Sequence, residues 1–455
     1  MKFDFGRPPM EMFHMPTLHP GLHYVPPRPG WVMRPAQGGR VRGFAASENE
    51  AMRAMQRETI QNFDRRLMDE VMEINSTPVV MEQAEFCKDG VLIDKRALLN
   101  GASGDRVRRK YDLQNSDKAR QDRLADAFAR ARRRGTSNLP VWKDPVDSLD
   151  IAIEVKNGFN YYHFTQESLG ALAHFSGDDS GRPINLHLPP GDVRGFIMGF
   201  IGAIFPQLAD RIRIQHKPTR YKKVRSVYSH RHYLYQVADE RIGQTATNIT
   251  EGRWGRPRHD ITHRRIVGMS SFDSCLRLLR DHALRRVPQS MVAGMPKLVW
   301  MGRDESGDAR ARGIGGHEAL LEELTARGFE TVIFEHLAPL EQIAAMQAAD
   351  IVIAPHGAGL VNMAYARPET LVIEIGSRQT QLHRWGVFHS AAHVAGCRYD
   401  AVFADIMGAT NPEGVPPISK GLLGVTLGKR ATDRILRIVA EATGDKSSEP
   451  LCSAG

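Results

Sequence analysis

The stretch ADIVIAPHGAGLVN, residues 349–362, constrains the fold more than any other part of the chain. Residues 351–354 form a short apolar run rich in β-branched side chains and ended by Pro355, which predicts a buried strand of a parallel sheet. The glycines after His356 predict a tight turn, and residues 360–366 are expected to open a helix. A second buried strand is expected over residues 370–375, with Glu374 near its carboxyl end.

A strand that leads through a glycine-rich turn into the N-terminus of a helix favours the binding of an anion at that turn. Gly357, Ala358 and Gly359 can bring backbone N–H groups close to a ligand, and the helix dipole adds positive charge there. In open α/β sheets, ligands bind outside the carboxyl ends of the strands, where His356 and Glu374 are expected. The alternative is that the glycines only permit close helix packing.

Composition sets outer limits on the class of protein. The chain has 455 residues, is 42% hydrophobic and 25% charged, and carries a formal net charge of +9. Its length allows two or three cores, and its positive charge suits phosphate-bearing ligands or an anionic membrane surface. We expect no nucleic-acid partner, because no zinc-finger, RNA-recognition or helix-turn-helix signature is present. The four cysteines are scattered, without metal-ligand spacing, and no long apolar run or secretory signal is evident, so a cytoplasmic protein is expected.

Alternating strand and helix patterns predict two α/β domains. We expect an irregular N-terminal arm and helix over residues 1–77, and a first α/β domain over residues 78–290 that contains a basic helical insertion at 97–147. A second α/β domain is expected over residues 291–430, and a C-terminal helix and tail over 431–455. The first domain should begin with a hairpin whose strands are residues 79–81 and 91–93.

Two arginines and one histidine–glutamate pair complete the candidate site. Arg303 follows the first strand of the second domain, and Arg312 ends the loop after it. In the first domain, His163 and Glu167 are four residues apart on a predicted helix, so they can reach one ligand or each other. Taken alone, a pair with this spacing is more often a surface pair.

These residues resemble glycosyltransferase family 61, the capsular polysaccharide biosynthesis type. The resemblance rests on the PHGAGL-x-N motif, which includes Asn362, on the strand after it, and on Arg303, Arg312 and Glu318; it extends over roughly residues 150–405. His317 stands where the family usually has asparagine. An NYxHF pattern with a following acidic residue resembles the family's N-terminal half, where this helix faces the cleft.

The resemblance implies a GT-B-like enzyme, with two Rossmann-like domains facing across a cleft. It implies inverting transfer of a hexose or pentose from a nucleotide-diphosphate sugar, expected to be a UDP-sugar, to a glycan or lipid-linked acceptor. The donor-binding residues would be Arg303, Arg312, His356, Gly357, Ala358, Gly359, Asn362 and Glu374.

The residues themselves indicate how such transfer would proceed. The arginines and N–H groups would stabilise the leaving diphosphate, so we expect no cofactor and no obligatory metal. Inversion needs a general base, for which His163 oriented by Glu167 is preferred to the reverse assignment. Three classes remain open at this point: a transferase at the inner face of the membrane, a non-catalytic nucleotide-binding scaffold, and a nucleotide-sugar epimerase.

Overall fold

The structure is a computed structural model of the 455-residue chain. It describes residues 13–14, 16, 19–25, 33–37, 41–64, 70–87, 90–101, 104, 140–155, 157–229, 231, 271–304, 313–409, 414–418 and 421–444. The chain divides into two compact units. Unit 1 comprises Met1–Ala36 and Glu70–Arg286, and unit 2 comprises Gln37–Asp69 and Val287–Gly455.

Unit 1 is built on a mixed sheet. The described strands follow in space as β1 (Phe13–His14), β8 (Arg96–Leu98), β7 (Gly90–Ile93), β6 (Ser76–Cys87), β12 (Thr219–Ser229), β9 (Ile151–Glu154), β10 (Ile184–His187) and β11 (Ile212–Gln215), and β2 (Leu22–Tyr24) also pairs with β6. Strands β9, β10 and β11 are parallel. Strands β6 and β7 form an antiparallel hairpin, which confirms the predicted second strand at residues 91–93. Its first strand is residues 84–87, whereas the predicted residues 79–81 pair with β12 and β2. A smaller sheet joins β13 (Ser271–Asp273), β5 (Glu70–Ile74) and β3 (Met33–Gln37).

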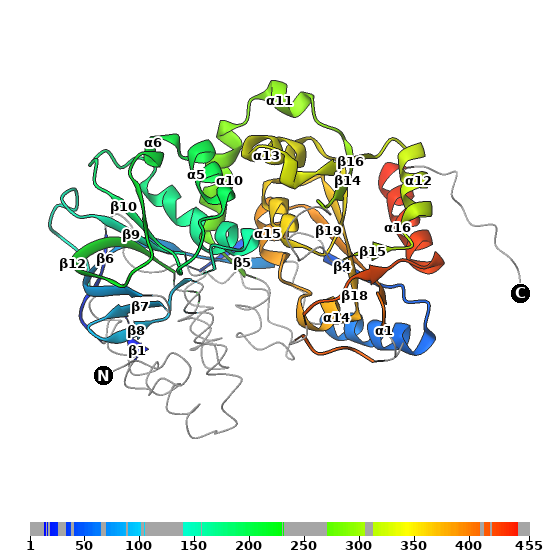
Figure 1. The fold of residues 1–455 in the computed structure, drawn as a ribbon, viewed down its shortest axis with the longest axis horizontal. Coiled ribbons are helices and arrows are strands. Elements are labelled where there is room, and N and C mark those ends of the chain that lie inside the picture. The colour runs from blue at the N-terminus through cyan, green and yellow to red at the C-terminus, as the bar shows by residue number, and fades with distance from the viewer. Residues whose placement is uncertain are drawn as a thin grey trace, which may run out of the picture. The chain divides into compact units, whose positions relative to one another are not determined.

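The helices of unit 1 gather beside its parallel strands (Figure 1). Those whose bounds fall in the described residues are α4 (Tyr161–His163), the π-helical turn η2 (Phe164–Ser168), the 3-10 helix η3 (Leu169–Phe175), α5 (Gly195–Ile204), α6 (Pro206–Ala209) and α10 (Ser274–Arg286). Helix α5 buries Ile197, Phe200 and Ile201 in the core. Gly170 allows η3 to pack closely on α10, because a Cβ atom at that position would lie 2.5 Å from the Cys275 carbonyl oxygen.

Unit 2 is built on a largely parallel sheet. Its described strands follow in space as β15 (Ile314–Gly315), β20 (Val425–Thr426), β19 (Arg398–Ile406), β18 (Leu371–Ser377), β17 (Ile351–Pro355), β14 (Leu298–Gly302) and β16 (Glu330–Ile333). The expected buried strands over residues 351–354 and 370–375 are thereby confirmed as β17 and β18, whose residues are all buried. Pairing is parallel from β16 through β14, β17 and β18 to β19.

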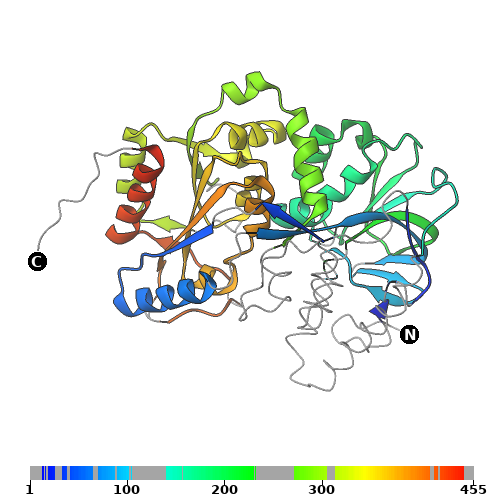
Figure 2. The ribbon, with the colours of Figure 1, turned by 180° about the vertical axis from the view of Figure 1, so that it is seen from behind.

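Helices cover both sides of this sheet. Helices α12 (Glu318–Ala326) and α16 (Lys429–Thr443) pack on one side, where Leu324 and Ile435 join a core with Ile351 and Ile373. On the other side, α13 (Pro339–Ala348) and α15 (His389–Ala395) both contact the 3-10 helix η5 (Ala358–Tyr365). Figure 2 shows the red α16 separated from the orange and yellow helices by the strands. The remaining helices of this unit in the described residues are α1 (Glu50–Asp64), α11 (Gln289–Ala293), η4 (Phe334–His336) and α14 (Arg378–His383).

The segment 37–69 belongs to unit 2, whereas the sequence analysis placed it in an N-terminal arm. Strand β4 (Val41–Ala45) pairs in parallel with β19. The Gln56 side chain of α1 donates from Nε2 to the Ala404 carbonyl oxygen at 3.2 Å. Because these partners lie more than 300 residues away in the chain, no local pattern could reveal them.

The predicted class, mixed α/β with parallel strands, is confirmed, and it is compatible with a Rossmann-like glycosyltransferase fold. The facing of two such domains across a cleft stays a prediction. Most of the basic insertion at 97–147, together with Arg312 and residues 445–455, lies outside the described residues. No helix in the described ranges is both long enough and apolar enough to cross a membrane.

Candidate functional site

The glycine-rich turn begins at the carboxyl end of β17, where the register of the sheet brings His356 to Glu374. Ala354 of β17 is paired with Glu374 of β18. The backbone N–H of His356 donates to the Ile375 carbonyl oxygen at 2.8 Å, so the strand pairing continues one residue past Pro355. Parallel pairing thus places side chains 18 positions apart in sequence next to one another.

His356, Glu374 and Tyr399 form a buried chain of hydrogen bonds. Because an ionised carboxylate can only accept, Nδ1–H of His356 donates to Glu374 Oε1, and the Tyr399 hydroxyl donates to Oε2. The exposed fractions of His356 and Glu374 are 9% and 3%. Burial, together with the neighbouring Glu374 charge, raises the pKa of Tyr399 well above its usual range, so its hydroxyl keeps the proton that it donates. Nε2 of His356 has no partner among the described residues.

Glu374 was expected among the donor-binding residues, where its carboxylate would accept hydrogen bonds from the ligand. In the structure, both of its carboxylate oxygens are occupied from within the protein. Its position instead resembles that of a carboxylate that fixes the tautomer and orientation of a histidine ring. The ring atom left for a ligand is then Nε2 of His356.

The Arg303 side chain contacts the start of the glycine-rich turn. It follows β14, and its Nη2 donates to the carbonyl oxygens of Pro355, at 3.3 Å, and of His356. A Cβ atom at Gly357 would run into this guanidinium group, which explains why glycine is needed there although its backbone is extended. Burial lowers the pKa of Arg303, but an arginine starts so high that the group stays charged.

The turn offers backbone donors beside that charge. The N–H of Leu360 donates to the Gly357 carbonyl oxygen at 3.1 Å and is therefore used within the turn. In the described part of the chain, the N–H groups of Gly357, Ala358 and Gly359 have no acceptor. The expected helix after the turn is the 3-10 helix η5. A guanidinium group and three N–H groups at one strand end can together bind an oxyanion.

The remaining predicted donor-binding residues are Asn362 and Arg312. Asn362 is fully buried and donates from Nδ2 to Gln342 Oε1 at 3.2 Å, so in this structure its side chain links η5 to α13. Arg312 lies outside the described residues, and its role stays a prediction.

The predicted His163–Glu167 pair is formed in unit 1. Nδ1–H of His163 donates to Glu167 Oε1 at 2.8 Å, and the two side chains are 37% and 21% exposed. The Asn160 side chain caps the segment by accepting from the His163 backbone N–H at 3.4 Å. The segment is a helical turn continued by the π-helical turn η2 rather than a regular helix. Oε2 of Glu167 is buried and has no partner among the described residues.

Sequence reasoning missed two aromatic neighbours of His356 and Glu374, and an ion pair next to Arg303 in the sequence. Tyr399 holds Glu374, the Phe388 ring lies 5.4 Å from the His356 ring, and His336 lies 3.3 Å from Asp304, the residue after Arg303. Tyr399 lies in an apolar strand and looked like an ordinary core residue. A signal existed only for Asp304, which directly follows a predicted strand end. Within the described ranges, no three His, Cys, Asp or Glu side chains are arranged to hold a metal ion.

Comparison with known families identifies the class of protein. Residues 161–373 match the model of a glycosyltransferase family, so this part of the chain is a glycosyltransferase domain. The family is described as Glycosyltransferase 61, which confirms the resemblance seen in the sequence. The match runs from α4, just before His163, to β18, one residue before Glu374, and so includes parts of both units. A search of curated proteins gave no match.

Proposed function

We propose that the protein is an inverting glycosyltransferase that moves a sugar from a nucleotide-diphosphate donor, a UDP-sugar, to a hydroxyl group of a glycan or lipid-linked acceptor in surface polysaccharide synthesis. The observation that carries the proposal is the contact between Arg303 and the turn at Gly357. It brings a buried positive charge to three N–H groups that have no acceptor among the described residues. A departing diphosphate needs such a group of donors.

The donor site would act mainly through charge. As the bond between the sugar and the diphosphate breaks, negative charge grows on the leaving phosphate oxygens. Arg303 and the turn are fixed before the reaction, so they stabilise that charge without having to reorganise. His356, held by Glu374 at Nδ1, would offer Nε2 to a phosphate oxygen or a sugar hydroxyl. This arrangement supports catalysis without an obligatory metal.

The acceptor would be activated by His163. With Nδ1–H donated to Glu167, Nε2 carries the lone pair that can take a proton from the acceptor hydroxyl. The buried Oε2 of Glu167 could accept a further hydrogen bond from substrate or water. Transfer then joins the acceptor oxygen to the anomeric carbon, while the nucleoside diphosphate leaves with the bonding electrons.

Calorimetric titration with UDP, followed by product analysis with UDP-sugars, tests the proposal. Gly357→Ala should weaken UDP binding because the added Cβ displaces Arg303. Gly294→Ala, at the end of α11, is the matched control, since its Cβ would make only ordinary contacts at 3.7–3.8 Å. Equal UDP affinity in both variants would remove the turn from the donor site. UDP binding without transfer would support a scaffold, and conversion of the donor sugar without acceptor would support an epimerase.

A further inference from the structure

Helix α5 has no polar side chain, although one of its faces is exposed. Its sequence is GFIMGFIGAI, and Ile197, Phe200 and Ile201 are buried in the core of unit 1. On the outer face, Gly199 is exposed and Met198 is 39% exposed. A helix at the surface of a globular protein normally presents polar or charged residues to solvent. The outer face of α5 is therefore an apolar surface that would gain from being covered.

Two glycines keep this outer face low. A Cβ atom at Gly195 or Gly202 would meet nothing within 4 Å, so packing against the described residues does not require glycine at either position. Glycine also lowers the stability of a helix relative to alanine. Small residues do, however, let another apolar surface come close to a helix backbone. The glycines are thus explained if the outer face of α5 meets a partner.

The apolar surface of α5 adjoins the segment that carries His163. The Tyr161 ring of α4 lies 5.5 Å from the Phe196 ring of α5, measured between centroids. Phe159, two residues before Tyr161, is 52% exposed. In the described part of unit 1, Phe159 and Met198 are the large apolar side chains with the greatest exposure. The apolar face and the candidate base therefore share one helical framework.

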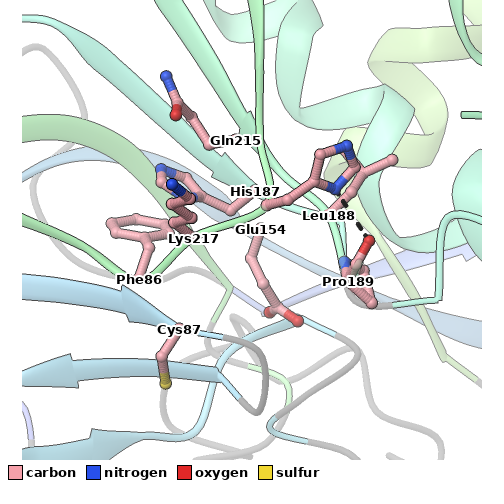
Figure 3. Close-up of a pocket in the computed structure, with 9 residues that line it drawn as sticks. Phe86, Cys87, Glu154, His187, Leu188, Pro189, Gln215 and Lys217 are labelled. Atoms are coloured by element: carbon pink, nitrogen blue, oxygen red, sulfur yellow. Dashed lines mark hydrogen bonds between the residues drawn. The ribbon is translucent and has the colours of Figure 1, made fainter. Parts of the chain in front are cut away.

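The connection that leads into α5 is held in place. Leu188 and Pro189 follow β10 on the way to the helix (Figure 3). Nδ1–H of His216 donates to the Pro189 carbonyl oxygen at 3.0 Å. The hollow that these residues line has room for only about one water molecule. A larger partner near α5 would therefore contact the outer face of the helix and not this hollow.

Positive charge without an ion-pair partner lies at the end of the apolar face. Arg286, the last residue of α10, donates from Nε to the Ala203 carbonyl oxygen of α5 at 3.3 Å. Arg285 and Arg286 are exposed, and among the described residues neither has a carboxylate partner. Asp192 and Arg194, which precede α5, are also exposed and have opposite charges. An apolar helix face with an excess of basic side chains at its edge is typical of a helix that lies on an anionic membrane.

We propose that the outer face of α5, together with Phe159, docks on an anionic membrane surface. Met198 and Phe159 enter the boundary between the lipid head groups and the acyl chains, and Arg285 and Arg286 face the phosphates. Docking by itself does not depend on the proposed function. Its consequence for catalysis rests on that function: a lipid-linked acceptor is held at the same surface as the segment that carries His163.

Vesicle flotation of the full chain tests this proposal. The vesicles contain phosphatidylcholine alone, or phosphatidylcholine and phosphatidylglycerol in equal parts. We expect the wild type to float with the anionic vesicles and much less with the neutral ones. Met198→Glu should weaken binding to the anionic vesicles about tenfold, because it removes an apolar side chain that the membrane buries. Leu382→Glu, at a 47% exposed position of α14 in unit 2, is the matched control and should bind as the wild type does.

Arg285→Gln separates the contribution of charge from that of apolar contact. It should weaken binding to the anionic vesicles about fivefold, and raising the salt concentration should abolish this difference, because attraction to anionic lipid is screened by salt. Met198 and Arg285 are both exposed, so the unfolding temperatures of their variants should match that of the wild type and keep the test informative.

Three results would overturn the proposal: no flotation of the wild type with anionic vesicles, equal binding of Met198→Glu and Leu382→Glu, or a wild-type dimer that Met198→Glu dissociates in analytical ultracentrifugation. The last result would show that a second copy covers the face. UDP titration of the same samples separates this proposal from the proposed function. Vesicle binding without UDP binding would refute the donor site but keep the docking face. UDP binding and transfer without vesicle binding would reject the docking face alone.

Discussion

Each unit contains a histidine whose Nδ1 is bonded to a glutamate Oε1, but the two pairs are built in opposite ways. His163 and Glu167 meet across one helical turn, 2.8 Å apart, with side chains 37% and 21% exposed. His356 and Glu374 meet across two strands, with side chains only 9% and 3% exposed, and Tyr399 occupies the second carboxylate oxygen. Local spacing creates the first pair, and sheet register creates the second.

The difference in exposure suggests different work for the two pairs. A general base must reach a substrate hydroxyl and exchange its proton, which suits the accessible His163. A buried ring fixed at Nδ1 by a fully bonded carboxylate is better suited to holding a group in one orientation. Substitutions in the two pairs separate these roles, and Arg312→Ala and chelation then test the donor site, with expected effects that run from the largest to the smallest.

The largest effect is expected from His163→Ala. If His163 takes the acceptor proton, turnover should fall by about 10²–10⁴-fold, while UDP affinity measured by calorimetry stays unchanged. Loss of thermal stability with normal turnover per folded molecule would instead indicate a packing role. Full activity in the folded variant would end the assignment, and Glu167→Gln, which keeps the side-chain shape, shows how far orientation contributes.

Removing the two glutamates should affect stability very differently. Glu374→Ala leaves the buried His356 and Tyr399 without their acceptor and should lower the free energy of unfolding by about 3 kcal/mol. Glu167→Ala breaks an accessible helical pair and should cost about 0.3–0.5 kcal/mol. Urea denaturation of the two variants checks the contrast. Equal losses would mean that burial does not distinguish the pairs.

Arg312→Ala tests whether the donor site extends beyond the described residues. Loss of a charged hydrogen bond to the diphosphate should weaken UDP binding by about 1.5–3 kcal/mol, as measured by calorimetry. Arg310→Ala, two positions earlier in the sequence, is the control for a general loss of positive charge. Equal weakening in both variants would point to long-range attraction, and unchanged affinity in Arg312→Ala would exclude this residue from the site.

The smallest effect is expected from chelation. If Arg303 and the N–H groups of the turn stabilise the leaving diphosphate, EDTA should leave turnover nearly intact. The measurement is the initial rate of transfer before and after EDTA, and then after added manganese. Complete loss that manganese restores would show that a metal ion, rather than the buried arginine, stabilises the leaving group.

The sequence predicted those parts of the fold that are encoded locally. The apolar run ended by Pro355 is β17, and residues 91–93 lie in a hairpin strand, β7, although their partners are residues 84–86 and not the predicted 79–81. The spacing of His163 and Glu167 predicted their contact, because neighbours on one turn need no tertiary information. Helix type was not predictable in this way, since 3-10 and π-helical turns depend on packing.

Contacts between strands that are distant in the sequence were not predicted. Tyr399 reaches Glu374 only because β19 lies beside β18. Glu374 was predicted near the end of its strand, but β18 continues to Ser377. That its two carboxylate oxygens are bonded internally follows from its neighbours and not from its position in the sequence. The same holds for β4, whose partner β19 lies at the other end of the chain.

The pairing of β4 with β19 also has a consequence for biosynthesis. Arg42 of β4 and Asp400 of β19, which form an ion pair, are 358 positions apart. At the usual speed of a ribosome, β4 would emerge about 20–70 s before its partner strand. During that interval it has no native strand partner, and until β4 docks the buried strand β19 presents an open edge that invites pairing with other chains. The sheet of unit 2 therefore cannot be closed until two segments 358 positions apart have both been translated, which makes its closure late relative to the synthesis of β4.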